Sequence, residues 1–341
     1  MLIYISRRIL LMIPTLLGVL TITFVIAQFV PGGPVEQVIA ELRHRSASGA
    51  TTTHEISPKQ IEQIKKQFGF DKPPLERYLL MVRDYSRFNL GRSFTYGDDV
   101  WQVIKSKLPV SISLGLWSTL LGYLISIPLG ISKALREGSR FDTGTTVLVL
   151  VGFAIPGFVL GVLLIVLFAG GTFLDWFPLR GLVSDNWHEM SWPQRIGDYF
   201  WHLTLPLICL TIGNFATLTL LTKNTFVEEI RKQYVLTARA KGLSQRSVLY
   251  KHIFRNALLP LVTGLPGAVV AAFFSGALLV ETLFSLDGLG LLSYDSIMHR
   301  DYPVVLGSIY LFTMIGLVIK LISDLLYVAV DPRVQFGKAA R

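Results

Sequence analysis

The chain has 341 residues, of which 51% are hydrophobic and only 16% are charged, and its formal net charge is +9. Soluble domains usually carry roughly 25% charged residues, so this composition excludes an ordinary soluble protein and indicates a polytopic membrane protein. The basic residues mostly flank apolar runs, which favours membrane-adjacent loops over a nucleic-acid-binding surface.

Six uncharged apolar runs predict six transmembrane helices, because a spanning helix needs about 20 apolar residues. The first run follows Arg7 and Arg8 as a signal peptide would, but no A-x-A cleavage pattern follows it, so we expect a retained span. The last run reaches full length only if it continues to about residue 330, past Lys320 and Asp324. These two lie four apart on one helical face, where they can pair; an ion relay is the alternative. The runs are 9–30, 110–132, 143–174, 203–222, 256–280 and 302–319.

The basic residues predict the orientation of these spans. They gather before span 1, between spans 2 and 3, between spans 4 and 5, and after span 6. All four segments fall on one side of an even-numbered set of helices. The positive-inside rule makes that side cytoplasmic, so we expect both termini in the cytoplasm.

Two longer segments fall on the outer side. Within 31–109, residues 44–55 read as a flexible strip, Ser57 and Gly69 bound a short helix, and 73–88 form an amphipathic helix before a turn at Gly91. Residues 175–202 contain four tryptophans. Tryptophan is typical of the membrane interface, so we expect anchoring, with a substrate-contacting surface as the alternative.

Proline and glycine interrupt several of the predicted spans. They include Pro128, Pro156, Pro206 and Pro266, and such residues are common in membrane helices as kinks. Kinks also provide the hinges that transport requires. Gly157 and Gly161 form a small-xxx-small pair, which permits close contact between helices.

Motifs for independent chemistry are missing from the sequence. It contains no P-loop, H-E-x-x-H or G-x-S-x-G motif, and its six histidines lack metal-ligand spacing. The lone Cys209 allows no internal disulfide. We therefore expect no catalytic residue, metal or cofactor in this chain. A secondary transporter would need inverted repeats and ionisable groups at mid-membrane, and the sequence shows neither clearly. A membrane enzyme would need a cluster of catalytic polar residues at one depth, and none is apparent in the sequence.

A polar, basic segment, here called the 227–260 loop, separates spans 4 and 5. Its sequence predicts a helix over 228–241 that ends at Gly242, and a second helix over 245–256 with Ser244 as N-cap. Two short helices that meet at a glycine turn can insert into a groove on a soluble partner. The alternative is an amphipathic loop that lies on lipid, and the residues alone leave both open.

The same segment resembles the EAA loop of bacterial ABC-importer permeases. Residues 237–244 read T-A-R-A-K-G-L-S, His252 follows, and 255–260 read R-N-A-L-L-P. This form is similar to the peptide/nickel family. Leu236 stands where the general pattern has Glu, and 18 positions separate Gly242 from Pro260 where that pattern has 13. Both departures are usual for the peptide branch.

The resemblance extends over nearly the whole chain. Residues 281–290, ETLFSLDGLG, resemble the family's ET-x-FS-x-PG-x-G, with Asp287 in place of proline and therefore a looser outer turn expected. Residues 327–333 match Y-x-x-x-DPR. The chain is most similar to the B-type subunits of importers for peptides and microcin C.

This resemblance implies an all-α polytopic protein of the bacterial inner membrane with the type I ABC-importer permease fold and six transmembrane helices. It implies a first helix at 1–30, a periplasmic segment at 31–109, a permease core at 110–330 and a cytoplasmic tail at 331–341. The implied partners are a second homologous permease subunit, two ABC ATPase subunits or one fused ATPase, a periplasmic substrate-binding protein and the lipid bilayer, without nucleic acid.

The implied activity is import by alternating access, with ATP and magnesium bound by the partner ATPases and none in this chain. The implied substrates are peptides, including peptide–nucleotide antibiotics such as microcin C; nickel, glutathione and sugar-peptides are the alternatives within the family.

The resemblance also assigns site residues. Arg239, Lys241 and Arg246 are expected to pair with acidic groups of the ATPase. Tyr234, Leu243, Val248 and Leu249 either fill its groove or pack the loop's own helices together. Glu281 is a candidate outer gate or substrate contact, or simply a carboxylate at headgroup level. The predicted ATPase-coupling residues are Tyr234, Thr237, Ala238, Arg239, Ala240, Lys241, Gly242, Leu243, Arg246 and Pro260.

Overall fold

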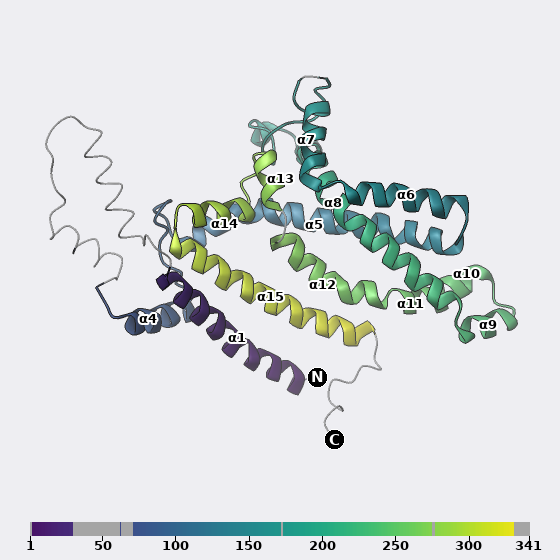
Figure 1. The fold of residues 1–341 in the computed structure, drawn as a ribbon, viewed down its shortest axis with the longest axis horizontal. Helices are drawn as coiled ribbons and strands as arrows, with labels where there is room; N and C mark the ends of the chain where they lie inside the picture. Colours follow the sequence, from purple (N-terminus) through teal and green to yellow (C-terminus); the bar gives the residue numbers. More distant parts are fainter. Residues whose placement is uncertain (1, 30–61, 63–70, 172, 275–276, 331–341) are drawn as a thin grey trace. The chain divides into compact units, whose positions relative to one another are not determined.

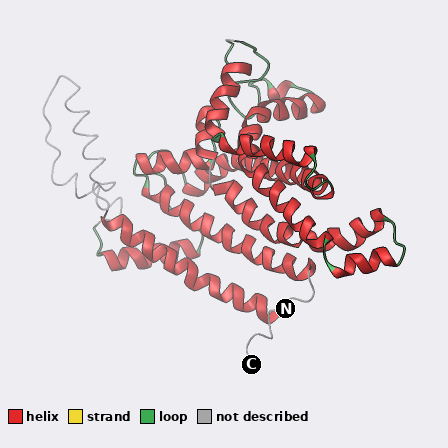
Figure 2. Cartoon of the chain, turned by 45° about the vertical axis from the view of Figure 1, so that its right-hand side comes forward, coloured by secondary structure: helices red, strands yellow, loops and turns green. Residues whose placement is uncertain are grey.

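A computed structural model describes residues 2–29, 62, 71–171, 173–274 and 277–330 (Figure 1). The strip predicted at 44–55, the helix predicted between Ser57 and Gly69, and the tail at 331–341 lie outside these residues. Within the described part, regular structure is helical apart from an isolated antiparallel bridge between Arg92 and Asp99 (Figure 2). The all-α prediction is therefore confirmed for this part of the chain.

Four helices among the described residues are long and apolar enough to cross a membrane. They are α1 (Leu2–Phe29), α5 (Val100–Leu135), α8 (Trp192–Ile230) and α15 (Tyr302–Val330). They confirm the first, second, fourth and sixth apolar runs as helices, and α15 continues past Lys320 and Asp324 as predicted. At 1.5 Å per residue, the 39 residues of α8 extend about 58 Å, so this helix is longer than a hydrocarbon core of about 30 Å.

The third apolar run is interrupted at Pro156, as the sequence predicts. It forms α6 (Arg140–Ala154) and α7 (Gly157–Phe168), which meet at an angle of 92°. Ile155 has extended backbone angles, with φ −86° and ψ 117°. The ring of Pro156 disfavours helical geometry in the residue before it, so the helix ends there. Counted as one broken span, this pair raises the number of candidate spans from four to five.

The fifth apolar run also differs from a single helix. Its described residues form α12 (Leu259–Phe274) and α13 (Ala277–Leu283), and α14 (Leu289–Met298) follows. Only a shorter apolar helix, Leu259–Val269, is recognised in this region. The sixth span that the sequence predicts therefore remains a prediction.

The chain divides into two compact units, Met1–Ser106 with Leu292–Leu317 and Lys107–Leu291 with Val318–Arg341. In the first unit, α4 (Pro74–Ser86) confirms the amphipathic helix predicted at 73–88. It packs on α1, where the hydroxyls of Tyr78 and Thr21 lie 2.7 Å apart. The buried Asp301 carboxylate accepts hydrogen bonds from the Ser93 hydroxyl at 2.5 Å and the Thr95 amide at 2.9 Å, and so fixes the start of α15.

In the second unit, α7 packs closely against α8. A Cβ at Gly157 would lie 2.8 Å from the Cys209 carbonyl oxygen, and one at Gly161 would lie 3.4 Å from the Cys209 sulfur. The small-xxx-small pair therefore does permit a close helix contact, and Cys209 is buried, as predicted. Trp176, Trp192 and Trp201 of segment 175–202 are exposed, which is compatible with membrane anchoring and with a substrate-contacting surface alike.

Candidate functional site

The 227–260 loop begins where α8 ends at Ile230, and not with one helix over 228–241 as predicted. The Arg231 and Lys232 amides donate to the Glu228 and Glu229 carbonyls and close the last turn. Lys232 is extended, with φ −73° and ψ 149°, and α9 (Gln233–Ala240) starts after it. The break at these two residues lets α9 turn away from the axis of α8.

Gly242 ends α9 as the sequence predicts. Its φ of +77° lies in the left-handed region that glycine adopts most readily. The Leu243 amide donates to the Ala238 carbonyl at 3.4 Å, and the Gly242 amide donates to the Arg239 carbonyl at 2.9 Å. These two bonds form a Schellman motif, which fixes the angle between the two halves of the loop.

A Gly242→Ala substitution is expected to destabilise this turn by about 1 kcal/mol, because alanine must enter the left-handed region. The effect is conformational and not steric, since no atom lies within 4 Å of the Cβ position. Faster hydrogen–deuterium exchange of the Leu243 amide measures it. Gly138→Ala, on the α5–α6 turn at φ +76° and also with open space, is the control that leaves this amide unchanged. An unaltered Leu243 exchange rate in the Gly242 variant would contradict the prediction.

The second half of the loop starts at Ser244, whose hydroxyl accepts a hydrogen bond from the Ser247 amide at 3.3 Å. This confirms the predicted N-cap. The helix that follows is irregular: α10 (Gln245–Ser247) passes into η2 (Val248–Ile253), which is a π-helix, and then into α11 (Phe254–Ala257). Short π-helical stretches are rare and are found frequently at functional sites.

The two halves share a hydrophobic core with the helices below them. Val235 and Ala238 of α9 are buried with Val248, Ile253 and Ala257 of the second half, and Phe226 of α8 and Ala134 of α5 join the same cluster. Val248 therefore packs the loop's own helices together, and Tyr234 and Leu249 are half-buried against the same core. Because it has this core, the loop is a packed element rather than a flexible connection.

Tyr234 adds a polar contact across the loop. Its hydroxyl donates to the Glu229 carboxylate at 2.7 Å, and the His252 carbonyl oxygen lies 3.5 Å away. Burial, followed by the hydrogen bond to Glu229, raises the pKa of the Tyr234 phenol above its ordinary value. The phenol therefore remains a neutral donor at physiological pH and joins the end of α8 to η2.

The outward face of the loop combines apolar and basic side chains. Of the apolar residues predicted to fill a partner's groove, Leu243 is exposed, and the structure adds Leu236 and Tyr250, which are exposed by 54% and 56%. Neither Leu236 nor Tyr250 was predicted from the sequence to lie on this face. Leu236 adjoins the buried Val235, so the helical period of α9 turns it outward. The exposed predicted residues are Thr237, Arg239, Ala240, Lys241, Gly242, Leu243, Arg246 and Pro260.

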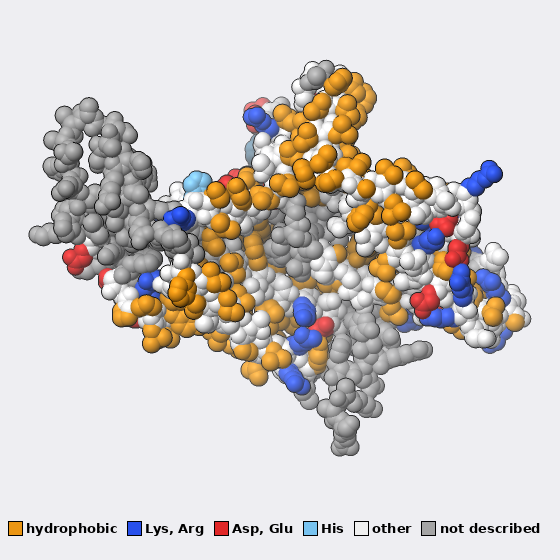
Figure 3. All heavy atoms as spheres, viewed as in Figure 1, with side chains coloured by type: hydrophobic (Ala, Val, Ile, Leu, Met, Phe, Trp, Pro, Cys, Tyr) orange, Lys and Arg blue, Asp and Glu red, His pale blue; other side chains and the backbone are white. Residues whose placement is uncertain are grey.

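Figure 3 shows charged side chains gathered at the end of the second unit that carries α9 and α10, whereas the visible surface of α6 and α7 is mostly hydrophobic. This separation is typical of a chain whose apolar helices lie in lipid and whose polar end meets water. The prediction that the exposed basic residues contact an ATPase is compatible with their exposure and stays a prediction.

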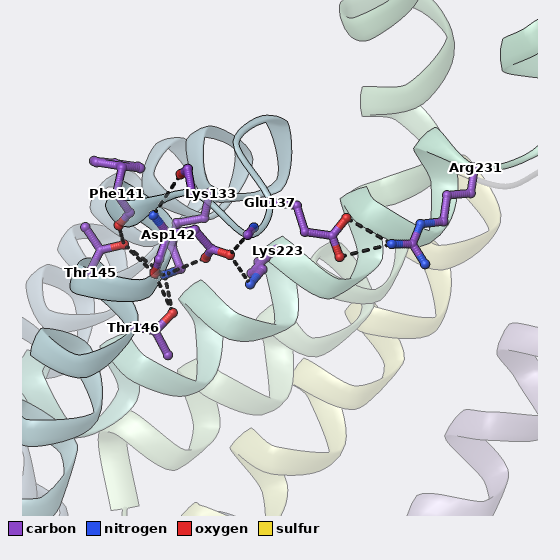
Figure 4. A network of polar contacts seen from close by, with 10 residues as sticks. Lys133, Glu137, Phe141, Asp142, Thr145, Thr146, Lys223 and Arg231 are labelled. Carbon is purple, nitrogen blue, oxygen red and sulfur yellow. Dashed lines mark hydrogen bonds and ion pairs between the residues drawn. The ribbon is translucent and has the colours of Figure 1, made fainter.

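A buried ionic cluster, formed by Lys133, Asp142 and Lys223, lies at the same end of the unit (Figure 4). Its members come from α5, from the first turn of α6, and from α8. The Lys133 and Lys223 ammonium groups lie 3.1 Å and 2.6 Å from the two carboxylate oxygens of Asp142. From the sequence, Lys133 was only one of the basic residues between the second and third apolar runs, because no local pattern joins it to Asp142 and Lys223.

Glu281 is completely buried, with an exposed fraction of 0%. Its carboxylate accepts a hydrogen bond from the Leu291 amide at 2.7 Å and has the Ser111 hydroxyl at 3.4 Å. A Cβ at Gly288 would lie 2.3 Å from the Glu281 carboxylate oxygen. The carboxylate therefore anchors the first turn of α14, and the glycine of this motif leaves room for it. A role of Glu281 as outer gate or substrate contact stays a prediction.

Asp287, which stands where the family pattern has proline, forms an ion pair with Lys107. The Leu286 amide donates to the Glu281 carbonyl at 2.7 Å, and the Gly288 amide donates to the Leu286 carbonyl at 3.1 Å. These contacts tie the turn between α13 and α14 to α5 and α13, in place of the rigidity that a proline ring would provide.

Comparison with known proteins adds an independent finding. Residues 126–336 match the family model described as "binding-protein-dependent transport system inner membrane component". The chain is 53% identical to the peptidoglycan transport system permease protein YejB of Agrobacterium fabrum and 49% identical to the inner membrane ABC transporter permease protein YejB of Escherichia coli O157:H7, over 98% of both chains in each case. It is 35% identical to the oligopeptide transport system permease protein AppB of Bacillus subtilis, over 98% of this chain and 99% of that one.

Proposed function

The chain belongs to the family of binding-protein-dependent transport system inner membrane components, and from this we propose that it is the B-type permease subunit of an ATP-binding-cassette importer for peptides. The observation that best supports this proposal is the 227–260 loop. It combines a hydrophobic core of its own with an outward face of basic and apolar side chains. Such a packed projection can transmit a push or pull, which a flexible loop cannot.

The proposed arrangement has six transmembrane helices with both termini in the cytoplasm. The candidate helices already described supply four or five of these spans. Segment 31–109 lies in the periplasm and meets the substrate-binding protein. This topology follows from the distribution of lysine and arginine and places the 227–260 loop on the cytoplasmic side, where an ATPase is available.

The proposed machine contains a second permease subunit, ATPase subunits that hold all of the ATP and magnesium, and a periplasmic binding protein. This chain has no catalytic residue of its own. ATP binding brings the ATPases together, the 227–260 loops follow them, and the pathway changes from inward-facing to outward-facing. The chain thus contributes alternating access, in which the nucleotide state of a partner shifts the population of two conformations.

The proposed cargo is a peptide. The relatives in Agrobacterium fabrum and Bacillus subtilis are named for the transport of peptidoglycan and of oligopeptides. Both cargoes contain amino-acid chains, so short peptides and peptidoglycan-derived peptides are the two substrate kinds to test first. Peptide–nucleotide conjugates such as microcin C are a third.

Reversal of charge on the outward face of the loop tests the coupling proposal. In the full complex, Arg239→Glu with Lys241→Glu is expected to reduce ATP-driven uptake of labelled peptides at least tenfold. The reason is that both side chains are exposed and would repel the acidic groups that they are proposed to contact. Uptake into proteoliposomes measures the effect, and co-purification with the ATPase measures the contact.

Arg140→Glu is the matched control. Arg140 is also basic and exposed, and it is the first residue of α6, outside the loop. Uptake by this variant should remain within twofold of the native complex. Native-like uptake and ATPase co-purification in the loop variant would overturn the coupling role.

A further inference from the structure

The ionic cluster of Asp142 joins three helices through a single carboxylate. One carboxylate oxygen lies 3.1 Å from the Lys133 ammonium, and the other lies 2.6 Å from the Lys223 ammonium. The Gly138 amide donates to the second oxygen at 3.1 Å. Asp142 therefore holds α5 and α8 to the first turn of α6, and Figure 4 shows the three side chains converging from these helices.

Lys133 makes this junction rigid. Its side chain has an exposed fraction of 0%, and that of Asp142 has 5%. The ammonium group donates to the Asp142 carbonyl at 2.8 Å and to the Thr145 and Thr146 hydroxyls at 2.9 Å and 2.6 Å. A buried ammonium is tolerated only where such partners replace its water shell, so α5 and α6 are fixed in one relative position.

Lys223 differs from Lys133 because its side chain remains 19% exposed. It supplies the contact from α8 to the cluster, while Lys133 alone still neutralises Asp142 if Lys223 is removed. A substitution can therefore remove the ion pair between Lys223 of α8 and Asp142 without leaving the buried carboxylate unpaired. Because the two lysines differ in this way, Lys223 is the residue to substitute in a test of the cluster.

The cluster and the 227–260 loop are built on the same two helices. Lys133 adjoins Ala134, and Ala134 is buried in the loop's own core. Lys223 precedes Phe226 by one turn on α8, and Phe226 is buried in that core as well. A displacement of the loop that moves its core must therefore act on the residues that hold Asp142.

We propose that the Asp142 cluster is a positioning device that makes α6, and with it the bent α6–α7 pair, move as one body with the 227–260 loop. The proposal rests on the proposed importer function. It adds the contacts through which a movement of the loop would be transmitted to α6, a helix that contributes no residue to the loop's hydrophobic core. Packed contacts of fixed geometry are what such a route requires.

The test is Lys223→Met in the full importer complex, which removes the ion pair between α8 and Asp142. We expect peptide uptake per ATP hydrolysed to fall at least tenfold, whereas the amount of assembled complex and its basal ATPase rate remain within twofold. Lys223→Arg restores the charge and should recover at least half of native uptake. The matched control is Glu137→Gln on the α5–α6 turn, outside the 227–260 loop, which removes an exposed ion pair with Arg231 at 3.0 Å; we expect it to change uptake by less than twofold.

A distance measurement separates positioning from mere stability. Spin labels on Lys251→Cys in the loop and Leu148→Cys on α6 occupy exposed positions. Cys209 is buried, so we expect it not to take up label. The native complex should give one narrow distance distribution that is the same with and without ATP. In Lys223→Met the distribution should broaden or change with nucleotide.

Unchanged distances together with native uptake per ATP in Lys223→Met would overturn the inference and leave the importer function standing. A native complex that shows no ATP-driven uptake would overturn both. If Lys223→Met does not accumulate, Lys223→Gln, which keeps a donor for Asp142, takes its place. Failure of both variants to assemble would show a structural role only and would overturn the positioning role.

Discussion

A Gly130→Ala substitution is expected to lower the stability of the folded chain by about 1–3 kcal/mol, because the added methyl group has no space between α5 and α8. Its Cβ would lie 2.5 Å from the Thr222 Cβ and 2.8 Å from the Thr219 carbonyl oxygen. The second of these is a backbone atom, so no side-chain rotation relieves the clash and the two helices must separate. Close approach through small residues is a common way in which membrane helices associate.

The midpoint of thermal aggregation in detergent, followed by size-exclusion chromatography, measures this effect. Gly122→Ala is the control on the same pair of helices, where the added methyl group would lie 3.6 Å from the Leu218 side chain, an ordinary contact. Alanine favours helix more than glycine does, so the control should be as stable as the native chain or more stable. Equal midpoints for both variants would refute the steric explanation.

The second large effect is expected at the turn between α13 and α14. Gly288→Ala places a methyl group 2.3 Å from a Glu281 carboxylate oxygen, and the three nearest atoms all belong to Glu281. The carboxylate must move and lose its hydrogen bond from the Leu291 amide, and hydrogen bonds to charged groups contribute about 1.5–3 kcal/mol. We therefore expect Gly288→Ala to destabilise the chain by about that amount.

A double-mutant cycle with Glu281→Ala tests the explanation, because neighbouring residues couple by about 0.5–3 kcal/mol. In the Glu281→Ala background, Gly288→Ala should have almost no further effect. Gly290→Ala is the control: its Cβ would lie 3.0 Å from the Leu278 backbone nitrogen as well as from Glu281, so it should remain destabilising in both backgrounds. Additive effects of Gly288→Ala and Glu281→Ala would contradict the proposed contact.

The sequence predicted the parts of the fold that local physics determines. Long uncharged runs form helices because unpaired backbone groups are costly in lipid, and α1, α5, α8 and α15 follow from this rule. Gly242 and Ser244 were predictable for a similar reason, since the end of one helix and the cap of the next depend on the residues beside them.

The remaining features depend on contacts between distant parts of the chain. The interruption of the third run at Pro156 was predictable, but its size was not. Other runs also contain proline, yet among the described residues the bend of 92° occurs between α6 and α7, where Gly157 packs against the Cys209 carbonyl oxygen of α8. The Asp142 cluster likewise joins residues from three helices. Neither the size of the bend nor the cluster has a local sequence pattern, so neither could be predicted.

The π-helical stretch of the loop has a consequence for how related sequences should be compared. In a regular α-helix, residues five apart point about 140° away from each other, yet Val248 and Ile253 are five apart and both buried. A relative with one residue fewer between them would have these positions four apart, on one face of a regular helix, and would keep the same buried pair. We therefore expect related loops to tolerate single-residue insertions and deletions at this point, so alignments of such loops should match the buried positions and not a fixed count from Gly242.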